Sequence, residues 1–179
     1  MTILSLIHAP DPIFKKKAIE VDKIDDEIRT IIDDMFETLE FEKAVGIGAN
    51  MVGILKRIAV VDLHENNISK PHAFINPEII WESDKTQTFE EASICFAGIS
   101  AKITRPESIK LKYLDYDGEQ QELEAEGFLA TVIQHEIDYL NGITFLDHLS
   151  RTKREMLLKK MLKFIKNNPP HVHSESCNH

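Results

Sequence analysis

The residues most suggestive of chemistry are His135 and Glu136, which begin a His-Glu-x-x-His pattern that Tyr139 leaves incomplete. In the complete pattern the two histidines lie one helical turn apart, so both imidazoles can hold one ion while the glutamate acts on its bound water. Here a tyrosine stands at the position of the second histidine. The segment therefore indicates a metal-dependent hydrolase and, at the same position, the loss of one ligand.

A largely buried helix is predicted to carry these residues, over about residues 127–141. Its broad apolar face is formed by Phe128, Leu129, Val132, Ile133, Ile137 and Leu140. The sequence Asn141-Gly142 is a typical helix end. Two further amphipathic helices are predicted, a first over about residues 23–41 and a last over about residues 152–166, because apolar residues recur there at spacings of three and four.

The middle of the chain is predicted to be rich in β-strands. Short apolar or β-branched runs indicate strands over about residues 58–61, 73–75, 79–81 and 101–104. A hairpin is predicted for residues 109–113 and 123–125, across the turn Asp117-Gly118. Helices and antiparallel strands in this order predict an α+β domain.

Length and composition indicate one domain. With 179 residues, of which 42% are hydrophobic, the chain can bury a substantial core. We expect the domain to cover residues 1–168 and residues 169–179 to form a disordered tail, because Pro169-Pro170 follows the last predicted helix. The sequence assigns no oligomeric state.

Charge and cysteine content restrict the partners and the compartment. A formal net charge of −9 argues against nucleic acid and against an anionic membrane as partners, since both require a clustered basic surface. Two cysteines are too few for a disulfide framework and suit a reducing cytoplasm. The chain start lacks a basic segment, and no run approaches the roughly 20 apolar residues of a membrane span.

Three segments, in order, resemble the signature motifs of peptide deformylases, the enzymes that remove the formyl group from the initiating methionine of bacterial proteins. The segments are Gly46-Ile47-Gly48-Ala49-Asn50-Met51-Val52-Gly53, Glu91-Ala92-Ser93-Ile94-Cys95 and Gln134-His135-Glu136-Ile137-Asp138-Tyr139-Leu140. The family patterns are Gly-x-Gly-x-Ala-Ala-x-Gln-x-Gly, Glu-Gly-Cys-Leu-Ser and Gln-His-Glu-x-Asp-His-Leu. The similarity extends from about residue 4 to about residue 150.

The resemblance implies a single-domain peptide-deformylase-like fold, in which antiparallel sheets surround a central helix bearing the motif His-Glu-x-x-Tyr. It places Gly46, Gly48, Glu91 and Arg105 at the cleft. We expect Arg105 to form an ion pair with Glu91 or Asp138 that braces this cleft.

The resemblance also identifies the metal-ligand positions. In the family the cysteine of the second motif and both histidines of the third hold a divalent ion, usually iron, and only His135 matches. Ser93 replaces the cysteine, and a hydroxyl stays protonated where a metal-bound thiol would be deprotonated. Tyr139 replaces the second histidine with a phenol whose reference pKa is about 10. We therefore expect no metal cofactor, although the family would use Fe(II) or another divalent metal.

The remaining family roles fall on three positions. Glu136 matches the general acid/base, and the backbone of Ile94 matches one oxyanion donor. Met51 stands in place of the glutamine that supplies the second donor, and its thioether cannot donate. In an alternative, a shift of the shortened loop lets Asn50 supply an amide instead. The alternative for Glu136 is a buried acid hydrogen-bonded to His135, Tyr139 or Ser93.

Two other parts of the chain offer candidate metal ligands. Cys95 could reach the ion if its loop slides, but its ordinary role is that of a small buried hydrophobe. The tail offers ligand types at loose spacing, namely His171, His173, Cys177 and His179.

Two functions follow from these residues. The first is a deformylase-like protein that has lost its metal site and its formyl-methionyl hydrolase activity but still binds a formylmethionyl or methionyl peptide N-terminus. The second is an active peptide deformylase with a variant metal site. If the first holds, we expect a hydrogen-bonded cluster in which Tyr139 fills the volume of the ion; its members would be His135, Tyr139, Ser93 and Glu136.

Overall fold

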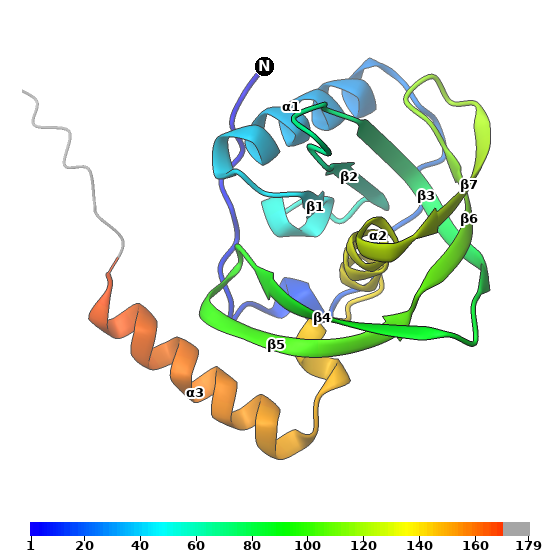
Figure 1. Ribbon diagram of the computed structural model, residues 1–179. Helices are drawn as coiled ribbons and strands as arrows, with labels where there is room; N and C mark the ends of the chain where they lie inside the picture. Colours follow the sequence, from blue (N-terminus) through cyan, green and yellow to red (C-terminus); the bar gives the residue numbers. More distant parts are fainter. Residues whose placement is uncertain (170–179) are drawn as a thin grey trace, which may run out of the picture.

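A computed structural model describes residues 1–169 of the protein, so that the predicted tail, with its candidate ligands from His171 onward, lies almost entirely outside the described residues. Within these described residues, three α-helices are arranged with a five-stranded and a two-stranded antiparallel sheet (Figure 1). This is the predicted α+β class. Within residues 1–169, no helix is long and apolar enough to cross a membrane.

The five-stranded sheet has the strand order β1-β2-β3-β6-β7, and every neighbouring pair is antiparallel. Its strands are β1 (Gly46–Gly48), β2 (Ile58–Asp62), β3 (Pro71–Glu82), β6 (Ser108–Leu114) and β7 (Gln120–Glu126). The second sheet pairs β4 (Thr86–Ser93) with β5 (Phe96–Pro106). The predicted hairpin is confirmed as β6 and β7, with Leu111 opposite Leu123.

The strand predictions needed two corrections. The two segments predicted at 73–75 and 79–81 form one strand, β3, whose register shifts near Asn76. Asn76 has a φ of 51°, and its side chain bonds both the N–H and the carbonyl of Val21, which interrupts the alternation. Strands β1 and β4 were not predicted, because β1 has only three residues and β4 is mostly polar.

Helix α2 (Gly127–Leu140) lies between the two sheets and carries the incomplete motif (Figure 1). Every residue from Ala130 to Ile137 is buried, so the helix contributes to the core on most of its circumference. Its side chains reach both main apolar clusters: Ile133 belongs to the cluster under β6 and β7, and Tyr139 to the one under α1 and β5. The prediction of a largely buried helix is confirmed.

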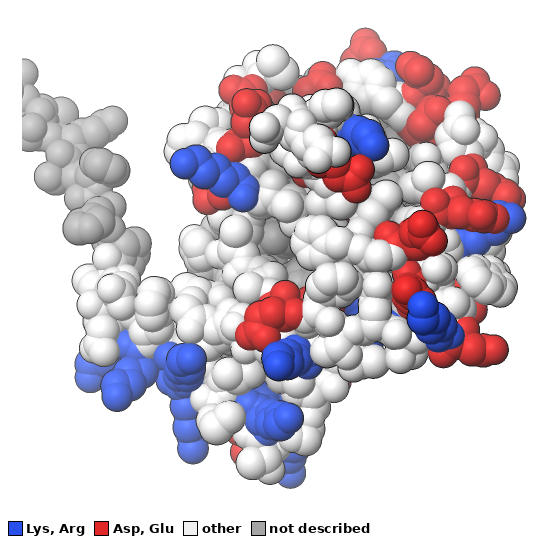
Figure 2. All heavy atoms as spheres, in the orientation of Figure 1, with Lys and Arg blue, Asp and Glu red and all other residues white. Residues whose placement is uncertain are grey.

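Two helices flank this core. Helix α1 (Asp26–Glu42) begins later than predicted because Asp25 caps it, its side chain accepting a hydrogen bond from the Ile28 N–H. Helix α3 (Arg151–Asn167) packs along β5. Figure 2 shows the Lys and Arg side chains gathered along α3, while the hollow between α1 and β4 is mostly uncharged. The short 3₁₀ helices are η1 (Pro12–Lys15), η2 (Ala49–Val52) and η3 (Phe145–His148).

The contact between α3 and β5 depends on a glycine. Gly98 has a φ of 74°, and a Cβ built on it would overlap the ring of Phe164. We expect Gly98→Ala to lower the free energy of unfolding by more than the roughly 1–2 kcal/mol of an L-residue in this region, because the ring must also move. Denaturant unfolding measures this loss.

Gly127→Ala is the matched control, since Gly127 also has a positive φ, of 62°, but has no atom within 4 Å of its built Cβ. Equal losses for the two variants would contradict the packing argument.

Candidate functional site

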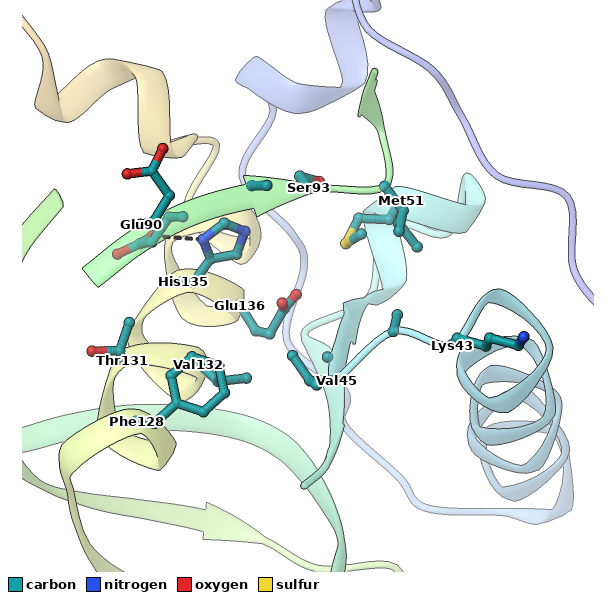
Figure 3. A pocket seen from close by; sticks show the side chains of 15 residues that line it. Lys43, Val45, Met51, Glu90, Ser93, Phe128, Thr131, Val132, His135 and Glu136 are labelled. Atoms are coloured by element: carbon teal, nitrogen blue, oxygen red, sulfur yellow. Dashed lines mark hydrogen bonds and ion pairs between the residues drawn. The ribbon is translucent and has the colours of Figure 1, made fainter. Parts of the chain in front are cut away.

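The three motif segments converge on one cavity of about 370 Å³, framed by α2, β4, β1 and the end of α1 (Figure 3). Seven of the predicted site residues line it: Gly46, Met51, Glu91, Ser93, Ile94, His135 and Glu136. Gly48, Arg105 and Tyr139 are buried and are not among its lining residues. Sequence reasoning did not find the walls formed by Phe128, Thr131, Val132 and Lys43, because they belong to none of the motifs.

Ser93 and Tyr139, at two of the three ligand positions, bond each other. The Tyr139 hydroxyl donates to Ser93 Oγ at 2.7 Å, and Ser93 Oγ also accepts from the Cys95 N–H at 3.2 Å. The Tyr139 side chain is fully buried among the rings of Phe14, Phe96 and His135. Burial raises the phenol pKa well above its ordinary value, so the neutral hydroxyl is the stable form. The predicted contact between these two residues is confirmed.

His135, at the third ligand position, is oriented by Glu91. Its Nδ1 lies 2.8 Å from Glu91 Oε1, and its ring stacks on Phe145 with 5.9 Å between the ring centroids. Because an ionised carboxylate only accepts, Nδ1 carries the hydrogen in this pair and Nε2 of the neutral ring keeps its lone pair. The bond to Glu91 therefore sets the tautomer of the histidine.

Arg105 holds the carboxylate that orients this histidine. Its Nε and Nη2 donate to the two oxygens of Glu91 at 2.8 and 2.9 Å, and its Nη1 donates to Asp138 at 2.7 Å. Burial would raise the pKa of Glu91, but the hydrogen bonds from His135 and Arg105 outweigh it and lower this pKa. Asp138 is also bonded by His148 at 2.8 Å, a contact that sequence reasoning missed. The predicted ion pair of Arg105 is confirmed with both acids.

Glu136 stands apart from these networks. It is 4% exposed, and its Oε2 has no hydrogen-bond partner in the described structure. Burial raises the pKa of Glu136 to about 7, which His135, the Gly48 N–H and Arg105 only partly oppose. The predicted bonds from Glu136 to His135, Tyr139 or Ser93 are wrong. His135 Nδ1 is bonded to Glu91 instead, and the Tyr139 hydroxyl to Ser93.

The oxyanion positions are altered as the sequence indicates. Met51 is buried at the cavity wall, and its sulfur accepts the Gly48 N–H at 3.2 Å. The alternative in which Asn50 supplies the amide does not hold, because its side chain is fully buried, donates to the carbonyl of Tyr139 at 2.8 Å and is not among the lining residues. Ile94 lines the cavity, so its backbone remains the predicted donor.

The residues at the three ligand positions are unsuited to binding the divalent ion that the family uses. The three ligand positions offer one imidazole, one serine hydroxyl and one neutral phenol, and the last two are bonded to each other. Within residues 1–169, no group of three or more His, Cys, Asp or Glu side chains is placed to hold a metal.

Cys95 does not complete such a site either, because it lies in the turn between β4 and β5 and is 1% exposed. Burial raises its thiol pKa to about 12. The prediction of a small buried hydrophobe is confirmed.

Comparisons with known proteins agree with the motif resemblance. A sequence model of the family described as polypeptide deformylase matches residues 3–155. A "Peptide deformylase-like" protein of Rickettsia conorii is 64% identical over 174 residues, covering 97% of this chain and 95% of that protein. The "Peptide deformylase" of Phenylobacterium zucineum is 43% identical over 167 residues, covering 93% and 99%. The crystal structure of peptide deformylase from Ehrlichia chaffeensis in complex with actinonin has a TM-score of 0.88 at 36% identity, covering 94% and 99%.

The hydroxyl of Tyr139 is expected to contribute to stability. Tyr139→Phe removes the bond to Ser93 and should lower the free energy of unfolding by about 1 kcal/mol, the usual net value of one hydrogen bond. Urea unfolding measures this change. Tyr113→Phe is the control, because the half-buried Tyr113 hydroxyl makes no side-chain hydrogen bond among the described residues. An equal effect of both substitutions would contradict the role of this bond.

Glu136 is expected to make stability depend on pH. Its folded pKa, about 7, lies above the ordinary 4.5, so folding favours the protonated acid. This contribution is complete below pH 4.5 and is lost as the pH rises through 7. Relative to Glu136→Gln, the wild type should lose about 2–3 kcal/mol of unfolding free energy between pH 5 and pH 8. A difference between the two proteins that stays constant with pH would refute the shift.

Proposed function

The chain belongs to the polypeptide deformylase family, and from this membership we propose that its cavity binds a peptide N-terminus without the metal ion and formyl hydrolysis of the family. The observation that carries this proposal is the 2.7 Å bond from Tyr139 to Ser93, made where the family holds its ion. The small number of cysteines supports a reducing cytoplasm as the compartment.

The chemistry of the donors supports the loss of hydrolysis. A bound divalent ion lowers the pKa of its water from 15.7 to about 7, a difference of on the order of 12 kcal/mol. Glu136 alone cannot supply this, because a buried carboxyl with a pKa of about 7 is a far weaker base than the hydroxide it would have to generate. The absence of the glutamine amide at Met51 removes a further factor of about 100 to 1,000 in rate.

The retained cavity supports binding. Its walls include Phe128, Val132 and Ile94, which suit an apolar side chain, and its polar lining residues include His135 and Glu136. In the Ehrlichia chaffeensis structure the corresponding fold accommodates actinonin. We propose that this chain uses its own cavity for the first residue of a peptide.

A second candidate is an active peptide deformylase with a variant metal site. The comparisons favour it, because proteins 41–44% identical to this chain bear the name peptide deformylase. Its support within the structure is His135, whose Nε2 is directed by the Glu91 bond, beside the retained acid Glu136.

Metal quantification together with a formylmethionyl-peptide assay separates the two candidates. We expect the purified wild type to contain no stoichiometric metal that depends on His135 and to show no turnover, with the Phenylobacterium zucineum relative as a positive control. His135→Ala distinguishes metal at this site from metal bound elsewhere on the chain. Stoichiometric metal lost in His135→Ala, with turnover abolished by Glu136→Gln, would establish the second candidate.

Restoring the family residues tests how much of the machinery remains. We expect the triple variant Ser93→Cys, Tyr139→His and Met51→Gln to bind one metal per chain and to gain turnover, since Glu91 and Arg105 already orient His135. Adding Glu136→Gln to this variant should keep the metal and remove turnover. A triple variant that folds but binds no metal would show that the surrounding structure has also diverged.

A further inference from the structure

The positive charge of the chain is concentrated in its last helix. Helix α3 contains seven basic residues and one acid, Glu155, a formal charge of +6 in a chain whose net charge is −9. Both arginines of the helix are paired, Arg151 with Glu155 and Arg154 with Asp147. Its five lysines are exposed and form no ion pair among residues 1–169: Lys153, Lys159, Lys160, Lys163 and Lys166.

These lysines share the face of α3 that is turned away from the protein. The inner face packs along β5, with Met161 buried in the core. On the outer face Lys159, Lys163 and Lys166 follow one another at spacings of four and three residues. Lys153 and Lys160 are seven residues apart and form a second row beside them. The outer face of the helix is therefore a continuous cationic surface.

Exposed apolar side chains lie within this lysine face and at its edges. Met156 is 61% exposed and is three or four residues from Lys153, Lys159 and Lys160, so it lies in the middle of the face. Leu162, at one edge, is 51% exposed. Lysines surrounding exposed apolar groups are typical of surfaces that bind a bilayer, where cations contact lipid phosphates and apolar groups enter the acyl region.

The net negative charge of the whole chain does not prevent such a contact. At physiological ionic strength the Debye length is about 8 Å, so acids far from α3 are screened. Figure 2 shows the Asp and Glu side chains mostly over other parts of the molecule, whereas Lys and Arg gather along α3. An anionic surface that approaches this helix therefore meets a locally positive field.

We propose that α3 is a peripheral docking surface for a bilayer of anionic phospholipids. The five lysines contact the headgroup phosphates, and Met156 enters the boundary between headgroups and acyl chains. No residue of α3 lines the cavity of the motif residues, and Figure 1 shows α3 on the far side of β5 from α2. The inference therefore stands whatever the cavity binds.

The side chains of α3 favour lipid over nucleic acid as the anionic partner. Single-stranded nucleic acid is bound largely by stacking of bases on aromatic side chains and arginines. The one aromatic residue of α3, Phe164, has its ring against Gly98 on β5, and both arginines of the helix are bonded to acids. A phosphate backbone would also leave the apolar side chain of Met156 without a partner.

Co-sedimentation of the full chain with lipid vesicles tests the inference. One set of vesicles contains phosphatidylcholine alone, and the other an equal mixture of phosphatidylcholine and phosphatidylglycerol. We expect the chain to bind the mixed vesicles at least about 100-fold more tightly at physiological ionic strength, because each lysine near an anionic surface contributes a factor of about five. High salt should remove this preference.

Two variants assign the binding to the outer face of α3. The triple variant Lys153→Gln, Lys160→Gln and Lys163→Gln should bind the mixed vesicles about 100-fold more weakly. Met156→Gln should bind them about tenfold more weakly, because a side chain of similar size no longer gains from leaving water. Circular dichroism verifies that each variant is folded.

The matched control removes three lysines from another part of the surface, with the same change in net charge. It combines Lys85→Gln, Lys110→Gln and Lys112→Gln. Lys110 and Lys112 lie on β6, Lys85 precedes β4, and all three pair with acids. This variant should bind the mixed vesicles as the wild type does.

Several outcomes would overturn the inference. They are equal binding to both kinds of vesicle, binding to neither, an equal loss in the control variant, and an unchanged affinity in Met156→Gln. Polyuridylic acid is the competing probe. If the chain binds it more tightly than the mixed vesicles, α3 is a surface for nucleic acid and the lipid assignment is wrong.

Discussion

The buried guanidinium of Arg105 is the interaction on which the site depends. It comes from β5, bonds Glu91 on the neighbouring β4, and bonds Asp138 on α2, so it ties the two-stranded sheet to the central helix. Removing one partner from such a buried group typically costs 3–5 kcal/mol, because a charge is left unpaired. Through Glu91 the same group also fixes the ring of His135. The orientation of the site is therefore built into the contact between sheet and helix.

Beside this support, two of the three ligand positions of the family are occupied by neutral groups that bond each other. Tyr139 fills the interior with an aromatic ring and satisfies its hydroxyl on Ser93, in contact with the Phe14 and Phe96 rings. A neutral hydrogen-bonded pair needs no ion to balance it. Glu136, by contrast, belongs to no such pair, and burial shifts its pKa toward neutrality. The proposed function rests on this contrast between a satisfied pair and an acid with one unsatisfied oxygen.

The family relationship establishes the fold, whereas the residues at the site determine the activity. Identity of 41–44% to proteins named peptide deformylase establishes common ancestry and, with a TM-score of 0.88 to a solved deformylase, the common fold. Activity, however, depends on a few atoms at a site, and a fold can be kept while those atoms change. The relative with 64% identity is named deformylase-like.

The sequence by itself determined the class of fold, the central helix and the identity of the residues at the cleft. Apolar periodicity is local, so helices such as α2 could be predicted closely, and the spacing of the motif placed His135, Glu136 and Tyr139 on one element. The short strand β1 and the polar strand β4 could not be predicted, because pairing with distant strands defines them. Only the tertiary structure decided which polar groups meet. Arg105 and His135 both engage Glu91, while Oε2 of Glu136 is left without a partner in the described residues, since side-chain direction depends on packing between elements far apart in the chain.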